Sequence, residues 1–327
     1  MNHPHLLEFL KLIENEIQGF GFDKAEPEML YSPIHYTFKA GGKRLRPILL
    51  LAACEMFEGD CKNAIKQATA IELFHNFTLI HDDVLDNSEI RRGVETVYKK
   101  FGLNAAILTG DLLLIKSYQL LSESDPKVLK DVLGCFNDMT LKVYEGQKYD
   151  LDAHGEIGIK INEYIEMVQG KTSVLLAVAL KIGAILAGAS AHDADLIYTF
   201  GLEIGTAFQI KDDLLDVFGN PEVTGKQLGR DIINGKNTWP LIKCLEMGTQ
   251  ADNVELLHYA QSKDEDEQLR LEKVLSFYDK YQIKSHGNDE VNERYHKALN
   301  ALNHIQVKES KKDFLKNFAL YLMQRES

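Results

Sequence analysis

The chain has 327 residues, 45% of them apolar, and a formal net charge of −12 at pH 7. This apolar content excludes a disordered chain, and the length is sufficient to bury a large core. The acidic balance argues against nucleic acid as the main partner, because a nucleic-acid surface needs clustered cations.

The first predicted element is a helix over residues 6–20. Charged residues such as Glu8 interrupt its apolar positions, which is typical of an amphipathic helix and not of a signal peptide. The segment 41–47 follows, with the sequence GGKRLRP and three cations just before an apolar run. Glycine beside Lys or Arg lets the backbone approach an anion closely, and Arg makes paired contacts with phosphate. This segment is therefore a candidate anion site.

An aspartate motif of the form D-D-x-x-D occupies residues 82–86, inside an apolar, helix-patterned stretch. On a helix, the first and last aspartates of such a motif share one face. His75 lies two helical turns before Asp82 and shares that face. It is a candidate hydrogen-bond donor to phosphate, with an ordinary core histidine as the alternative.

A second motif of the same form occupies residues 212–216, again within an apolar helical pattern. Like charges at this spacing repel, and the apolar flanks limit their solvation, so we expect a cation to compensate them. Oxygen ligands alone favour Mg2+ over Ca2+ or Zn2+. Gln209 lies on the same stripe as Asp212, and Gly205 continues that stripe, which indicates either a groove or close helix packing.

Basic residues in the loops complete this pattern. They lie beside glycines or shortly after an aspartate motif, and they are Arg91, Arg92, Lys171, Lys226 and Lys236. Each one alone is more often a solvated surface charge. Together with the 41–47 segment they supply cations around an acidic metal site, which is what a pocket for diphosphates needs.

The whole chain is dominated by helical periodicity, and no linker divides it. The run 172–191 is the most apolar, but Lys181 interrupts it, so we expect a buried core helix and no membrane span. The four cysteines form no C-x-x-C pair and are expected to be free thiols. We predict an all-α protein, with residues 1–327 as a single helical bundle, located in the cytoplasm. Breaks between helices are expected at residues 19–33, 91–96, 154–162, 219–239 and 283–290.

Seven blocks in sequence resemble the trans-isoprenyl diphosphate synthase, or polyprenyl synthetase, family. They are GGKRLRP, HNFTLIHDDVLD, RRG, GKT, FQIKDDLLDVFG, GKQLGRD and NGK, within about residues 35–240. The resemblance implies an all-α bundle with a central cavity, three Mg2+ ions per active site and a homodimer. It also implies head-to-tail condensation of isopentenyl diphosphate with dimethylallyl, geranyl or farnesyl diphosphate, which are allylic diphosphates.

The resemblance further implies roles for single residues. The metal ligands would be Asp82, Asp86 and Asp212, and the residues that act through water or a neighbouring ligand would be Asp83 and Asp216. The catalytic residues would be Lys171, Thr172 and Gln209, which also contact the allylic diphosphate together with Arg91, Lys226 and Lys236. The isopentenyl diphosphate site would consist of Lys43, Arg46, His75 and Arg92.

The expected product is short. Phe77 lies five residues before Asp82, and helix geometry places it only on the flank of the aspartate face. The resemblance implies that a bulky aromatic residue here blocks the growing chain, while Thr78 beside it is small. We therefore expect the twenty-carbon geranylgeranyl diphosphate, with the fifteen-carbon farnesyl diphosphate as the alternative. Ordinary core packing of Phe77 is the other interpretation.

Two other protein classes fit part of the pattern. A class I terpene cyclase shares the first aspartate motif and the helical fold. Its second metal site, however, has an Asn/Ser/Glu pattern, and it has no site for a second substrate. A non-catalytic subunit of a heteromeric synthase typically lacks motif aspartates or the basic block. The second D-D-x-x-D motif, with Lys43 and Arg46, favours the catalytic synthase.

Overall fold

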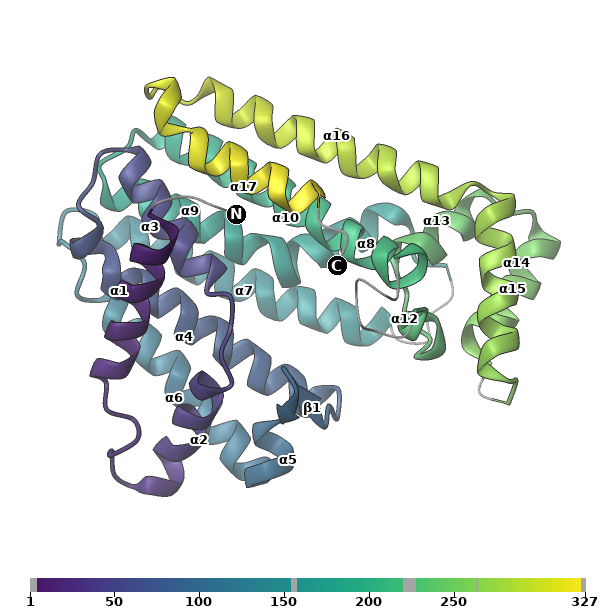
Figure 1. Ribbon diagram of the computed structural model, residues 1–327, viewed down its shortest axis with the longest axis horizontal. Coiled ribbons are helices and arrows are strands. Elements are labelled where there is room, and N and C mark those ends of the chain that lie inside the picture. The colour runs from purple at the N-terminus through teal and green to yellow at the C-terminus, as the bar shows by residue number, and fades with distance from the viewer. Residues whose placement is uncertain (1–4, 154–157, 220–227, 263, 325–327) are drawn as a thin grey trace. The chain divides into compact units, whose positions relative to one another are not determined.

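The computed structural model (Figure 1) describes residues 5–153, 158–219, 228–262 and 264–324. Lys226 lies outside these described residues. Within them the chain is helical apart from one short hairpin, in which β1 (Ile90–Arg91) pairs with β2 (Val94–Glu95) in antiparallel register. The predicted all-α fold is confirmed.

The chain forms two compact units. The first comprises Met1–Asn137, Val178–Ile197 and Gln306–Phe314, and the second comprises Asp138–Ala177, Tyr198–Ile305 and Leu315–Ser327. The expectation of one domain over residues 1–327 stays a prediction.

The core of the first unit is built around α3 (Leu45–Met56) and α4 (Cys61–Leu85). In α3, every residue from Pro47 to Cys54 is buried. The α4 helix starts at Asp60, whose carboxylate accepts a hydrogen bond from the backbone nitrogen of Lys62 at 2.9 Å and so caps the helix. It packs against α3 and lies alongside α6 (Figure 1). The other helices wholly in this unit are α1 (Leu6–Gly19), α2 (Glu28–Lys39), α5 (Val97–Phe101), α6 (Leu103–Leu121) and a 3-10 helix (Glu309–Lys311).

The second unit has its own core, which contains the buried side chains of Tyr164, Trp239 and Tyr278. The helices α14 and α15 pack side by side in this unit (Figure 1). Its elements are α8 (Ile161–Val168), a π-helix (Gln169–Ser173), α12 (Arg230–Ile233), α13 (Trp239–Met247), α14 (Gln250–Gln261), α15 (Glu267–Lys280) and α16 (Ile283–His304).

Four further helices contribute residues to both units: α7 (Leu129–Ala153), α9 (Val174–Leu186), α10 (Ala191–Phe218) and α17 (Asp313–Gln324). The segment Ile161–Leu186 is long and apolar enough to cross a membrane, but 67% of its most apolar window is buried inside the protein, as in a core helix. The predicted run 172–191 extends too far, because α9 ends at Leu186. Gly188 follows with a φ of 79°, a left-handed conformation that closes helices.

The predicted break at residues 283–290 is wrong. The α16 helix runs without interruption from Ile283 to His304, and the turn before it lies at Gln282, whose φ is 52°. Gly287 serves packing and not a turn. A Cβ atom at this position would lie 2.5 Å from Cδ2 of Leu214, so the side chain of Leu214 in α10 packs directly on the backbone of α16 at this glycine.

The first unit contains a similar close approach. A Cβ atom on Gly183 of α9 would lie 2.1 Å from the carbonyl oxygen of Leu50 in α3. We expect Gly183→Ala to lower the free energy of unfolding by about 1–3 kcal/mol, because the backbone of α3 has no room to move away. The measurement is urea-induced unfolding.

The matched control is Gly134→Ala. Gly134 is a helical glycine of α7 in the same unit, and a Cβ atom there would meet nothing within 4 Å. This change should raise the free energy of unfolding by about 0.5–1 kcal/mol, because alanine loses less backbone entropy than glycine. Equal effects of the two substitutions would contradict the packing explanation.

Candidate functional site

The first aspartate motif lies at the C-terminal end of α4. Asp82 is half-buried, and Asp86 is the exposed residue that ends the helix. Asp83 is buried, and its Oδ1 accepts a hydrogen bond from Nε of Arg91 at 2.7 Å. Burial raises the pKa of Asp83 from its usual value, while the charge of Arg91 opposes this rise. The middle aspartate of the motif therefore holds Arg91, and the outer two share the face that is more open to solvent.

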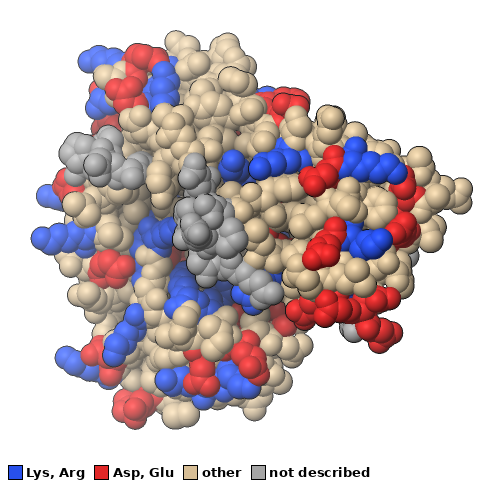
Figure 2. All heavy atoms as spheres, turned by 45° about the vertical axis from the view of Figure 1, so that its right-hand side comes forward, with Lys and Arg blue, Asp and Glu red and all other residues tan. Residues whose placement is uncertain are grey.

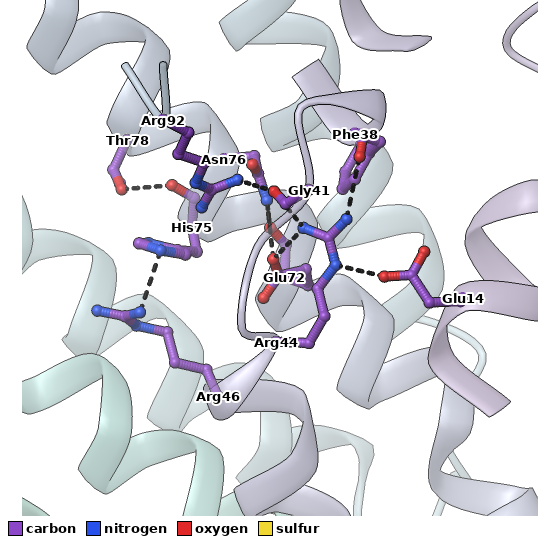
Figure 3. A network of polar contacts seen from close by, with 10 residues as sticks. All are labelled: Glu14, Phe38, Gly41, Arg44, Arg46, Glu72, His75, Asn76, Thr78 and Arg92. Atoms are coloured by element: carbon purple, nitrogen blue, oxygen red, sulfur yellow. Dashed lines mark hydrogen bonds and ion pairs between the residues drawn. The ribbon is translucent and has the colours of Figure 1, made fainter. Parts of the chain in front are cut away.

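The hairpin of β1 and β2 carries both arginines of the RRG block. Its turn consists of Arg92 and Gly93, with φ values of 53° and 79°. Two successive positive φ angles are the geometry of tight hairpin turns, and glycine accommodates the second without strain. Nη1 of Arg92 donates to the carbonyl oxygen of Gly41, in the basic 41–47 segment (Figure 3). The hairpin and the basic segment thus meet beside α4.

A small hollow, open to solvent, lies between α2, α4 and this hairpin. The α4 residues that line it are Asn76, Leu79, Ile80 and Asp83, and the hairpin contributes Arg91 and Arg92. Neither His75 nor Asp82 lines it. Asp83 and Arg91 line this hollow, and Nη2 of Arg91 also lies 3.9 Å from Oδ2 of Asp82, a predicted metal ligand.

Arg46, His75 and Arg92 come together in the first unit (Figure 3). Nη1 of Arg46 lies 3.0 Å from Nε2 of His75. Because a guanidinium has no acceptor, Nε2 must accept this hydrogen bond, and the proton of the neutral ring is on Nδ1. Burial lowers the pKa of Arg46 to about 10, so the side chain stays cationic at neutral pH. Lys43 is exposed on the same segment.

The second aspartate motif lies in α10. Its middle residue, Asp213, is buried and accepts three hydrogen bonds: from the hydroxyl of Tyr164 at 2.6 Å, from the backbone nitrogen of Trp239 at 3.0 Å and from Nε2 of Gln209 at 3.0 Å. Burial raises the pKa of Asp213 to about 6, although these donors lower it. Asp213 therefore ties three elements of the second unit together. Sequence reasoning missed this role, because Tyr164 and Trp239 lie in other helices.

The two outer aspartates of this motif, Asp212 and Asp216, are half-buried. Oδ2 of Asp216 accepts from the backbone nitrogen of Asp231 at 3.1 Å. The carboxylate of Asp231 in turn lies 3.0 Å from Nζ of Lys236. The structure thus brings Asp216 and Lys236 to either side of Asp231. Asp231 lies in the quoted GKQLGRD block, but no role was predicted for it.

Lys171 and Thr172 lie in the π-helix, which is a wide helical turn often found at functional sites. Nζ of Lys171 lies 2.6 Å from Oδ2 of Asp150, another partner that the sequence did not reveal. A Cβ atom on Gly146 would lie 2.4 Å from the backbone nitrogen of Lys171, so α7 and the π-helix are in close contact. Gly205 also serves close helix packing, because a Cβ atom there would lie 2.9 Å from that of Ser173.

Across the described parts of the chain, no group of three or more His, Cys, Asp or Glu residues could hold a metal ion. Each motif instead offers its two outer aspartates as oxygen ligands, which fits Mg2+ because this ion is usually bound by one or two carboxylates with substrate phosphate and water. His81, next to Asp82, lies against α6, where its Nε2 is 3.2 Å from the carbonyl oxygen of Ile107.

On the face shown in Figure 2, basic and acidic side chains are interspersed. The net charge of the chain is −12, and the cluster of Arg46 and Arg92 beside α4 is a local concentration of positive charge within it.

Residues 27–277 match the sequence profile of the polyprenyl synthetase family. The chain belongs to this family. Members of the family are prenyl diphosphate synthases, which implies isopentenyl and allylic diphosphates as substrates and Mg2+ as the ion that accompanies them. The protein is thus an enzyme, a trans-prenyltransferase of the short-chain type.

Individual relatives agree with this assignment. The geranylgeranyl diphosphate synthase of Methanosarcina mazei is 42% identical over 228 residues, which cover 69% of this chain and 70% of that protein. A short chain isoprenyl diphosphate synthase of Methanothermobacter thermautotrophicus is 40% identical, with 73% and 74% covered. The crystal structure of geranylgeranyl pyrophosphate synthetase from Pyrococcus horikoshii matches with a TM-score of 0.92 and 32% identity, over 98% of both chains.

The environment of His75 predicts how stability depends on pH. Desolvation lowers the pKa of His75 well below its usual value, and Arg46 and Arg92 lower it further. As the pH falls through about 6.5, only the unfolded state takes up a proton at this residue, so folding loses stability. Between pH 7.5 and pH 5, the free energy of unfolding should fall more for the natural protein than for His75→Gln. Chemical denaturation at the two pH values checks this, and parallel losses would contradict a neutral His75.

Proposed function

We propose that this prenyltransferase condenses isopentenyl diphosphate head-to-tail with dimethylallyl, geranyl and farnesyl diphosphates and releases geranylgeranyl diphosphate. The observation that carries the proposal is the presence, in one unit, of a carboxylate pair and a separate arginine cluster. Asp82 and Asp86 suit a diphosphate bound through Mg2+, whereas Arg46 and Arg92 suit a diphosphate bound directly. A terpene cyclase, with one diphosphate substrate, has no need of the second arrangement.

We assign the isopentenyl diphosphate to Lys43, Arg46, His75 and Arg92. Two hydrogen-bond donors support this assignment. The Nε–H of Arg46 is a buried donor with no protein partner within the described residues, so it remains available to a ligand. The Nδ1–H of His75 is a donor as well, since Nε2 accepts from Arg46. A diphosphate offers the acceptors that both groups need.

We assign the allylic diphosphate to Arg91, Lys171, Thr172, Gln209, Lys226 and Lys236, and three Mg2+ ions to Asp82, Asp86 and Asp212. Asp83 and Asp216 are assigned to act on the metal site through water or a neighbouring ligand. Three of the cations already have a carboxylate neighbour: Asp83 for Arg91, Asp150 for Lys171 and Asp231 for Lys236. These pairs orient the cations before the substrate arrives, which lowers the entropy cost of binding it.

Bound Mg2+ would supply positive charge to the departing diphosphate. Arg91, Lys171 and Lys236 take up part of the charge that develops as the bond between C1 and oxygen breaks and its electron pair leaves with the diphosphate. Arg46, His75 and Arg92 hold isopentenyl diphosphate so that its alkene attacks C1 and a carbon–carbon bond forms. The proton lost from C2 goes to the released diphosphate and not to a side chain. Apolar walls protect the allylic cation from water.

Both aspartate motifs should be essential. Asp82→Ala and Asp212→Ala should each lower kcat by about three orders of magnitude or more, because the leaving group loses its ion. Asp138→Ala, at an exposed aspartate of α7, is the control and should leave kcat unchanged. A radiometric assay with isopentenyl and farnesyl diphosphates measures these rates. Near-normal turnover by a folded Asp82→Ala or Asp212→Ala protein would sink the proposal.

The product length should depend on Phe77. This side chain is 2% exposed and packs between the rings of Phe74 and His81, with centroid distances of 5.4 Å and 4.8 Å. We expect Phe77→Ala to lengthen the product by one or more isoprene units, because it removes a bulky ring one turn below the aspartate motif. Phe74→Ala removes the same volume from the same helix and should leave the product at twenty carbons. Chromatography of the dephosphorylated products distinguishes them, and an unchanged product from Phe77→Ala would show that Phe77 is not the floor.

We also propose a cytoplasmic homodimer. Four large apolar side chains of α6, namely Leu103, Ile107, Leu108 and Ile115, are 40–56% exposed, and a second copy of the chain would cover them. The four cysteines are free, as expected in a reducing compartment. A molar mass near the 37.0 kDa of one chain in light scattering would contradict the dimer.

A further inference from the structure

Arg44 differs from the two other cations of the 41–47 segment. Its side chain is buried, with 2% of the residue exposed, whereas Lys43 is exposed and Arg46 is half-buried. It has a φ of 48°, and this left-handed conformation immediately before α3 turns the chain into the helix. The guanidinium donates to Glu14 at 2.8 Å, to Glu72 at 3.0 Å and to the carbonyl oxygen of Phe38 at 3.3 Å (Figure 3). The guanidinium of Arg44 is therefore buried and hydrogen-bonded within the protein, so it does not contact a substrate.

Glu72 is the more buried of the two carboxylates that bind Arg44. It lies on α4, one turn before His75, and 1% of it is exposed. Its Oε1 also accepts from Nδ2 of Asn76 at 3.1 Å, and the same nitrogen donates to the backbone oxygen of Glu72 at 2.8 Å. A buried carboxylate is costly unless charge and hydrogen bonds compensate it. Arg44 and Asn76 provide both and fix the carboxylate in one orientation.

The charge of Glu72 also acts on the arginines assigned to isopentenyl diphosphate. It raises the pKa of Arg46 and of Arg92, although burial lowers both. Arg44 and Arg92 are like charges that lie close together, since each contacts the carbonyl oxygen of Gly41. Arg44 is buried and Arg92 is exposed, so solvent screens their repulsion only in part, and an anion beside Arg44 offsets the rest. Glu72 is the buried anion that offsets it.

The same contacts shape the glycine segment. A Cβ atom on Gly42 would lie 2.9 Å from Nη1 of Arg44 and 3.0 Å from Nη1 of Arg92, so the two guanidinium groups pack directly on this residue. The side chain of Arg44 therefore constrains the backbone at Gly41 and Gly42. Lys43 and Arg46 project from the residues that follow.

We propose that Glu72, acting through Arg44, is a positioning residue for isopentenyl diphosphate. The buried ion pair holds the segment that carries Lys43 and Arg46, and the carboxylate keeps Arg92 beside them while the site is empty. Neither Glu72 nor Arg44 contacts the substrate. The inference rests on the proposed assignment of isopentenyl diphosphate to Arg46, His75 and Arg92.

A purely structural role for the pair predicts something different. Arg44 connects α1, through Glu14, with α3 and α4, so removing either carboxylate would weaken folding. Such a role alters stability alone. A positioning role alters the binding of one substrate and leaves the other unaffected, which gives a readout that structural weakening does not produce.

The experiment compares Glu72→Gln with Glu14→Gln. Both changes remove one carboxylate partner of Arg44 and keep a hydrogen-bond acceptor, but the Glu14 side chain is 37% exposed and lies on the far side of Arg44 from Arg92 (Figure 3). Glu72→Gln should raise the KM for isopentenyl diphosphate about tenfold or more. It should leave the KM for farnesyl diphosphate within about twofold, and Glu14→Gln should leave both constants within about twofold. Arg46→Ala serves as a positive control and should raise the KM for isopentenyl diphosphate.

The outcomes distinguish the proposed role of Glu72 from the assignment of isopentenyl diphosphate to Arg46. If Arg46→Ala raises this KM and Glu72→Gln does not, Glu72 is a structural anchor only, and the proposed function stands. If Arg46→Ala has no effect on isopentenyl diphosphate, the assignment of that substrate is itself wrong. If Glu72→Gln does not fold, Asn76→Ala keeps the ion pair but releases the carboxylate from its second donor. That variant should raise the same KM by a smaller factor, and an unchanged KM would overturn the inference.

Discussion

Repulsion between like charges is the constraint on which the proposed site depends. Arg44, Arg46 and Arg92 gather beside α4, where Arg44 is buried, Arg46 is half-buried and Arg92 is exposed. Two unit charges about 4 Å apart interact by roughly 4 kcal/mol under near-surface screening, so an uncompensated cluster would open or lose its order. The buried carboxylate of Glu72 offsets this cost without occupying the space that a diphosphate needs. The cations are then already in the arrangement that binds the substrate before it arrives.

The same principle recurs for the cations assigned to the allylic diphosphate. Arg91, Lys171 and Lys236 each lie within 3.0 Å of a carboxylate that is not an expected metal ligand. Such pairs add little to stability where they are exposed to solvent. Their value lies in orientation, because a long flexible side chain that is already held loses less entropy when a ligand binds.

The three aspartates of each D-D-x-x-D motif divide their roles by helix geometry. A step of one residue turns a helix by about 100°, so the middle aspartate leaves the face that the outer two share. Asp83 accordingly is buried against Arg91, and Asp213 is buried against Tyr164 and Trp239. The middle residues thus anchor each motif in its own unit. The outer residues remain more open to solvent, where hydrated Mg2+ and phosphate oxygens can reach them.

Sequence alone determined the helical class, the family and the shared faces of the aspartate motifs, because periodicity and motif order are properties of neighbouring residues. Through the family resemblance it also placed Arg46 and His75 in one expected site, but it did not reveal their contact. Only the tertiary structure decided the partners of the charges, such as Glu72 for Arg44 and Asp150 for Lys171, since these lie in different helices. It likewise decided that Gly287 packs inside a helix and does not end one, because the side chain that packs on Gly287 is Leu214 of another helix. Contacts of this kind depend on how helices pack against one another, and the pattern of neighbouring residues in the sequence does not determine that packing.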